Sequence, residues 1–120
     1  MYIEKVKDSF GDGFEWDVTV SDEVHRLLCF ADEELKPDDK IELTCFLAEK
    51  LRKSKRKKFL IRKENFYYVY KLRAKAIDVK KGEFEVYGFR FILDKYLPEN
   101  MKDGDFLKFI CIRMDCNKNG

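Results

Sequence analysis

The residues best able to bind a ligand are the cations between Lys50 and Lys58, where seven of nine positions are Lys or Arg. The chain of 120 residues has a formal net charge of only +2, so its positive charge is concentrated in one part. Residues 49–81 hold 14 Lys and Arg against three acidic residues, whereas residues 1–48 hold five against 13. This segregation predicts an anionic partner, with a solvated loop or pairing with the acidic part as alternatives. The cations of the run are Lys50, Arg52, Lys53, Lys55, Arg56, Lys57 and Lys58.

A second set of cations lies in a predicted hairpin of two strands, residues 66–79 and 84–93. A two-residue loop between them would place apolar residues opposite one another, with a bulge near Gly88 where the apolar parity changes. In this register Arg73 lies opposite Arg90, and like charges across a ladder destabilise a sheet by roughly 0.2–1 kcal/mol per pair. We therefore expect a binding role for this face, which carries Tyr67, Lys71, Arg73, Lys75 and Arg90.

An aromatic ring beside a row of cations is typical of grooves that bind single-stranded nucleic acid. Bases stack on the ring, and the cations follow the phosphates. Tyr67 shares the parity of Lys71 and Arg73, so this face predicts single-stranded DNA or RNA as the partner, with the basic run as a flexible arm. The competing hypothesis is a protein-interaction module, such as an inhibitor or accessory subunit, that docks on an acidic protein surface.

No arrangement of residues indicates catalysis. His25 is the sole histidine, and the sequence contains neither a GxxxxGK[ST] loop nor a CxxC pair. The acidic stretch 32–39 lacks the ligand spacing and the glycine of a calcium loop. We expect no catalytic residue, no metal and no cofactor; a metal-dependent nuclease that uses Asp and Glu is the enzymatic alternative.

Alternation with a period of two dominates the chain, as where Phe14, Trp16, Val18 and Val20 alternate with polar residues. The sequence therefore predicts one all-β domain over residues 1–120, most simply a small antiparallel barrel of five to seven strands, similar to the oligonucleotide/oligosaccharide-binding (OB) type. An SH3-like barrel or a small β-sandwich is the alternative. Expected strands cover 14–20, 24–30, 41–47, 59–61, 66–79, 84–93 and 105–114, with a basic loop or short helix at 48–58 and a turn at 62–65.

No stretch approaches the ~20 apolar residues that a membrane span needs, and the first residues lack an apolar segment. These features predict a cytoplasmic protein with no membrane partner. In that compartment the four cysteines are expected to be reduced. Cys29, Cys45 and Cys111 lie in apolar runs, which favours a role as small core residues.

Overall fold

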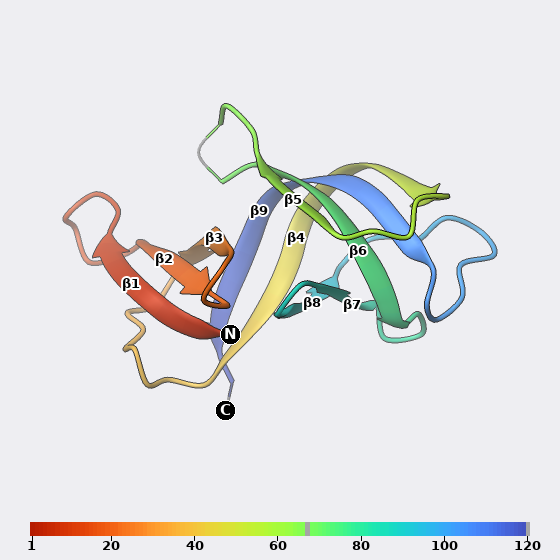
Figure 1. The fold of residues 1–120 in the computed structure, drawn as a ribbon. Coiled ribbons are helices and arrows are strands. Elements are labelled where there is room, and N and C mark those ends of the chain that lie inside the picture. Colours follow the sequence, from red (N-terminus) through yellow and green to blue (C-terminus); the bar gives the residue numbers. More distant parts are fainter. Residues whose placement is uncertain (67, 120) are drawn as a thin grey trace.

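The computed structural model of the protein describes residues 1–66 and 68–119, and within these ranges it is all-β, as the sequence predicts (Figure 1). These residues form nine strands joined by turns and loops, and they contain no helix. The strands are β1 (Tyr2–Asp8), β2 (Trp16–Ser21), β3 (Arg26–Ala31), β4 (Ile41–Ser54), β5 (Leu60–Lys63), β6 (Tyr70–Asp78), β7 (Glu83–Val86), β8 (Phe89–Leu93) and β9 (Phe106–Lys118).

Five of the strands close into a barrel, in the order β9-β4-β8-β7-β6, because β9 pairs with both β4 and β6. Neighbouring strands run antiparallel, except for the parallel pair β4–β8. The closure confirms the expected class, a small OB-like or SH3-like barrel, and it leaves fewer unpaired strand edges. The two longest strands, β4 with 14 residues and β9 with 13, coil around the barrel and carry much of its wall (Figure 1).

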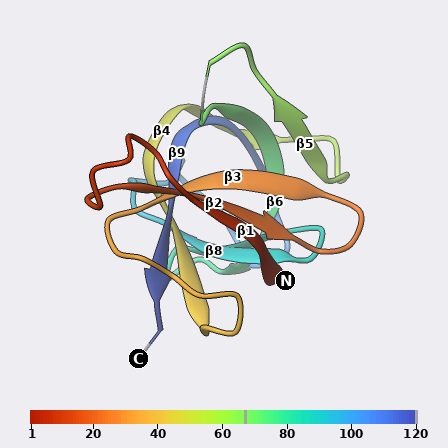
Figure 2. The same cartoon turned by 90° about the vertical axis from the view of Figure 1, so that its left-hand side faces the viewer.

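The remaining strands extend this barrel on two sides. β1, β2 and β3 form an antiparallel meander that joins β9 through the pair Phe30–Asp115. Seen from the side of this meander, the barrel lies behind it (Figure 2). β5 pairs with the first half of β6, on the edge that β7 uses further along the strand. The outer wall of the barrel therefore continues from β4 through β9 and β6 to β5.

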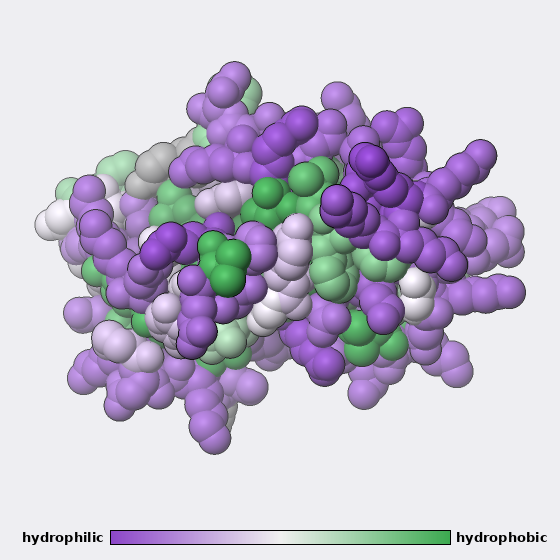
Figure 3. All heavy atoms as spheres, viewed as in Figure 1, coloured by the Kyte–Doolittle hydropathy of each residue, from purple (hydrophilic) through white to green (hydrophobic). Residues whose placement is uncertain are grey.

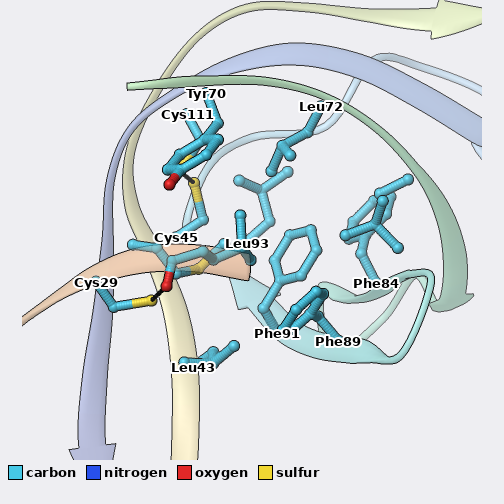
Figure 4. Close-up of a cluster of buried hydrophobic side chains, with 14 of the residues drawn as sticks. Cys29, Leu43, Cys45, Tyr70, Leu72, Phe84, Phe89, Phe91, Leu93 and Cys111 are labelled. Carbon is cyan, nitrogen blue, oxygen red and sulfur yellow. Dashed lines mark hydrogen bonds between the residues drawn. The ribbon is translucent and has the colours of Figure 1, made fainter. Parts of the chain in front are cut away.

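The barrel interior is filled by alternate residues of each strand, as the period of two requires. On β6, Leu72 and Ala74 are buried between outward-facing neighbours, and on β9 Leu107 and Phe109 are buried in the same way. Phe91 lies in an aromatic cluster, with its ring centroid 6.1 Å from those of both Phe84 and Phe109. Figure 4 shows Phe84, Phe89 and Phe91 among the buried side chains.

The predicted 66–93 hairpin is wrong in its loop, in its register and in its second strand. Four residues, 79–82, separate β6 from β7 in place of the expected two, and Phe84 lies opposite Ala76. Residues 84–93 do not form one strand, because the chain reverses at Tyr87-Gly88 and makes a separate β7–β8 hairpin. Tyr87 adopts a left-handed backbone conformation (φ 50°), which a continuous strand excludes. The change of apolar parity near Gly88 thus marks a turn and not a bulge. As a result Arg90 lies opposite Glu85 and not opposite Arg73.

The expected basic loop or short helix at 48–58 is also largely a strand. β4 continues to Ser54 and pairs with β9 as far as Phe106, so the ladder satisfies its backbone groups. A register irregularity between Glu49 and Arg52 accommodates Lys50, whose φ is 56°. The part of the basic run outside the strand is residues 55–58.

All four cysteines are buried and unbridged, and Cys45 Sγ lies 3.1 Å from Cys111 Sγ. The contact with Cys111 and burial raise the pKa of Cys45, and burial raises the pKa of Cys29 and brings that of Cys116 to about 12. Thiols in the unfolded chain ionise near pH 8.5. The folded state therefore keeps protons that the unfolded state loses, and stability must fall as the pH rises above that value.

We expect the free energy of unfolding, measured by urea titration, to be lower at pH 9.5 than at pH 7 by about 1 kcal/mol for each of the thiols of Cys29, Cys45 and Cys116. The Cys116→Ala variant should lose less between the two pH values than the wild type. An equal loss in both proteins would show that this thiol does not contribute.

Candidate functional site

A row of three cations crosses the outer wall of the barrel. Arg52 on β4 is the register partner of Lys108 on β9, and Lys108 is in turn the partner of Arg73 on β6. Register partners in neighbouring strands point to the same side of a sheet. The flanking residues Leu107 and Phe109 are buried in the barrel, so this row faces outward.

Two further cations lie in the adjacent row. Lys71 on β6 is the partner of Arg62 on β5, and on its other side it faces Ile110 of β9. On its other side, Ile110 has Glu49 of β4 as its register partner, so a negative charge lies at the edge of these two rows. We call the cations of these two rows the basic face: Arg52, Arg62, Lys71, Arg73 and Lys108.

The basic face carries little compensating charge of its own. Arg62 lies 3.4 Å from the carboxylate of Glu64. For the other four cations, no acidic side chain within residues 1–66 and 68–119 comes within ion-pair distance. Like charges placed opposite one another across a ladder oppose folding. The arrangement therefore has a cost that a bound anion would remove.

The electrostatics of Lys108 reflect this crowding. The charge of Lys71 is the largest influence that lowers the pKa of Lys108, followed by partial burial. The charges of Arg52, Arg73 and Arg62 act in the same direction. Lys108 lies between β4 and β6, so it receives the repulsion of both neighbouring strands.

Arg73 differs from the other members because only 8% of it is exposed. Its Nη1 donates to the carbonyl oxygen of Lys58 at 3.5 Å, and Leu60 is its register partner on β5. Its Nε is buried without a hydrogen-bond partner. The chain that leads into β5 thus partly covers this guanidinium, which adds charge beneath the surface.

The structure brings only some of the predicted site residues into the basic face. Arg52, Lys71 and Arg73 belong to it, and Lys75 continues the outward row of β6 between Phe106 and Glu85. Lys50 is exposed in the irregular part of β4 beside it. The exposed residues Lys55, Arg56, Lys57 and Lys58 follow the end of β4, where hydrophilic side chains cover the upper right of the molecule (Figure 3).

Other predicted residues are engaged elsewhere. Lys53 Nζ lies 3.1 Å from a carboxylate oxygen of Asp105. The guanidinium of Arg90, on β8, lies 3.6 Å from the carboxylates of both Glu83 and Glu85 on the neighbouring strand β7. The opposition of Arg73 and Arg90 that motivated this assignment is absent, because Glu85 takes that place. Tyr67 lies outside the residues that the structure describes.

Two members of the basic face were missed by sequence reasoning. Arg62 was assigned to a turn, but it lies in β5. Lys108 was hidden in an apolar strand, where it is the single charge between Asp105 and Arg113. An outward charge at the centre of such a strand is a local signal, but its meaning depends on which strands flank it.

Within the described parts of the chain, no group of three or more His, Cys, Asp and Glu side chains gathers as metal ligands would. The same residues include no helix of the length and apolarity needed to cross a membrane. No protein-family model matches the chain, and neither a curated protein nor a solved structure shows significant similarity to it.

Proposed function

We propose that the protein binds single-stranded nucleic acid, with the phosphates on the basic face. The observation that carries this proposal is the row Arg52–Lys108–Arg73, where three cations face one another across paired strands without an acidic partner among the described residues. A sheet gains no stability from such a row. Phosphate contacts would convert the repulsion into charge-assisted hydrogen bonds.

An exposed aromatic residue beside the basic face favours a single strand over a duplex. Phe66 lies in the turn between β5 and β6, the strands that carry Arg62 and Lys71, and is 75% exposed. Unpaired bases stack on such rings, whereas paired bases in a duplex present no free ring faces. Residues 55–58 would extend the phosphate contacts beyond the sheet.

The test is a fluorescence-anisotropy titration of a 12-nucleotide single strand, as DNA and as RNA, and of the matching duplex at two salt concentrations. When the logarithm of the affinity for the single strand is plotted against the logarithm of the salt concentration, the slope should be about −0.7 for each phosphate contacted. An affinity that does not change with the salt concentration would contradict the phosphate mechanism. No binding at low salt would refute the proposed function.

A matched pair of variants connects this measurement to the basic face. Arg52→Ala should weaken binding and reduce the salt slope by about 0.7. Arg90→Ala removes the same charge from an exposed position of β8 and should leave both unchanged. Equal effects of the two variants would mean that binding depends on net charge alone.

An acidic protein surface is the alternative partner for the same cations. It would be indicated by a complex that survives nuclease treatment and is lost in Arg52→Ala, together with no binding to oligonucleotides. The reduced, buried cysteines fit the cytoplasmic location that the sequence predicts.

A further inference from the structure

A pocket of about 460 Å³ lies beside the outer surface of β9, at some distance from the basic face. It opens between the β1–β2 loop, the end of β3 and the approach to β6. Aromatic rings form much of its wall, and a carboxylate and a hydroxyl complete it. The lining residues are Ser9, Phe10, Glu15, Phe30, Tyr68 and Arg113.

The walls of this pocket are held in place by contacts among themselves. The guanidinium of Arg113 lies over the ring of Phe30 at 4.5 Å and over that of Phe46 at 5.3 Å. Asp115 fixes the same guanidinium through Nε at 2.7 Å and Nη2 at 3.2 Å. The Tyr68 ring meets Phe30 edge-on, with 6.3 Å between centroids. The site is thus preorganised, which limits the entropy lost on binding.

Hydrogen bonds to one buried carboxylate hold two of the lining residues in place. The hydroxyls of Ser9 and Tyr68 both donate to Oδ1 of Asp17, which is 5% exposed. Phe10, in contrast, is 74% exposed and forms a free rim. The pocket therefore has two fixed lining residues and one accessible ring.

The pocket and the basic face share one strand. Arg113 and Lys108 both lie on β9, five residues or about 17 Å apart. Side chains an odd number of residues apart point to opposite sides of a regular strand. The register irregularity around Leu47, however, shifts the buried positions of β9 from Leu107, Phe109 and Cys111 to Met114 and Cys116, so Arg113 faces outward as Lys108 does. A single oligonucleotide that runs along β9 could therefore reach both places.

The chemistry of the pocket suits a base and not a phosphate. Glu15 gives the rim negative charge, and the charge of Arg113 is paired with Asp115. A phosphate would be repelled there, whereas a planar ring can stack on aromatic and guanidinium faces while its amino group donates to a carboxylate.

We propose that this pocket holds one nucleobase of the strand whose phosphates lie on the basic face, stacked on Phe10 and Phe30 with its edge toward Glu15. The inference rests on the proposed function, and it adds the element that recognises the base.

The test compares Phe10→Ala with Phe14→Ala, using a 12-nucleotide single strand at constant salt. Both phenylalanines are in the β1–β2 loop and are similarly exposed, at 74% and 73%, but only Phe10 lines the pocket. Loss of a base–aromatic stack predicts that Phe10→Ala weakens binding about 5- to 100-fold. Phe14→Ala should bind within about twofold of the wild type, and thermal melting should show that both variants are folded.

An abasic oligonucleotide of the same length separates stacking from charge, because it keeps the phosphates and lacks the bases. Phe10→Ala should bind it as the wild type does. The inference is overturned if Phe10→Ala binds the normal strand like the wild type, or if it weakens binding to the abasic strand equally. Arg52→Ala would still weaken binding in those cases, and the proposed function would stand. If the wild type binds no single strand at all, the proposed function itself fails.

Discussion

Replacing Lys108 with glutamate is expected to lower the affinity for a single-stranded oligonucleotide about 10- to 100-fold, while the fold remains at least as stable as the wild type. The first effect follows from the central position of Lys108 in the basic face, between Arg52 and Arg73. Glutamate would repel phosphate there and would also pair with the neighbouring cations, which removes charge from the two flanking strands.

Stability is expected to stay the same or rise, although affinity falls, because the positive charge of Lys108 is itself unfavourable in the folded protein. The pKa of Lys108 is lowered by the charge of Lys71 first, and by other neighbouring cations, so its positive charge is disfavoured in the folded state. A side chain retained for stability alone would not be placed at this position. A negative charge at residue 108 relieves the repulsion, and the temperature of unfolding should stay the same or rise.

Anisotropy titration and thermal melting of Lys108→Glu measure the two effects separately. Lys5→Glu is the matched control, because it makes the same change of net charge at an exposed position of β1. Binding should be weakened much more by Lys108→Glu than by Lys5→Glu. The basic face would lose its proposed role if Lys108→Glu lowered stability and left affinity unchanged.

The second large effect concerns the contact between the meander and the barrel. Gly88→Ala is expected to lower the free energy of unfolding by about 1–3 kcal/mol, because the added carbon would overpack the contact. A Cβ at position 88 would lie 2.7 Å from the Cβ of Asp22, well inside van der Waals contact. Asp22 lies in the β2–β3 turn, and its carboxylate accepts the backbone N–H of Gly88 at 3.2 Å.

Asp22 is held strongly enough to make this contact rigid. Partial burial would raise its pKa, but the backbone N–H groups of His25, Val24 and Gly88 and the His25 ring outweigh burial and lower it. The His25 ring also stacks on Tyr87, with 3.7 Å between centroids. The Asp22 side chain cannot move aside without losing these contacts.

A double-mutant cycle by urea unfolding tests the origin of the cost. In the Asp22→Gly background, which lacks the opposing Cβ, Gly88→Ala should cost much less than in the wild type. An unchanged cost would mean that the strain arises in the β7–β8 turn itself and not between the meander and the barrel.

The strands and the barrel class could be predicted because their signal is local. Alternation around Leu72 and Ala74 correctly assigned the inward face of β6, and with it the outward direction of Lys71, Arg73 and Lys75. The same reasoning failed at Gly88. There, a turn and a bulge produce the same change of parity, and the left-handed conformation of Tyr87 has no clear marker in the sequence.

The candidate site could be predicted only in part, because its members converge from distant parts of the chain. Arg52, Arg73 and Lys108 lie in three different strands, and the pairing of β9 with both β4 and β6 makes them neighbours. Lys108 alone is one charge in an apolar strand, and Arg90 alone looked equivalent to Arg73.

The sequence by itself determined the alternation of buried and exposed residues, the all-β class and the excess of positive charge between residues 49 and 81, since these depend on residue type and near neighbours. Only the tertiary structure decided which cations face one another, which are neutralised by Glu83, Glu85 or Asp105, and which pocket lies on the same strand. Strand register across a closed barrel is a long-range property, fixed by the packing of the interior, and a shift by one residue would move every outward charge to the other face.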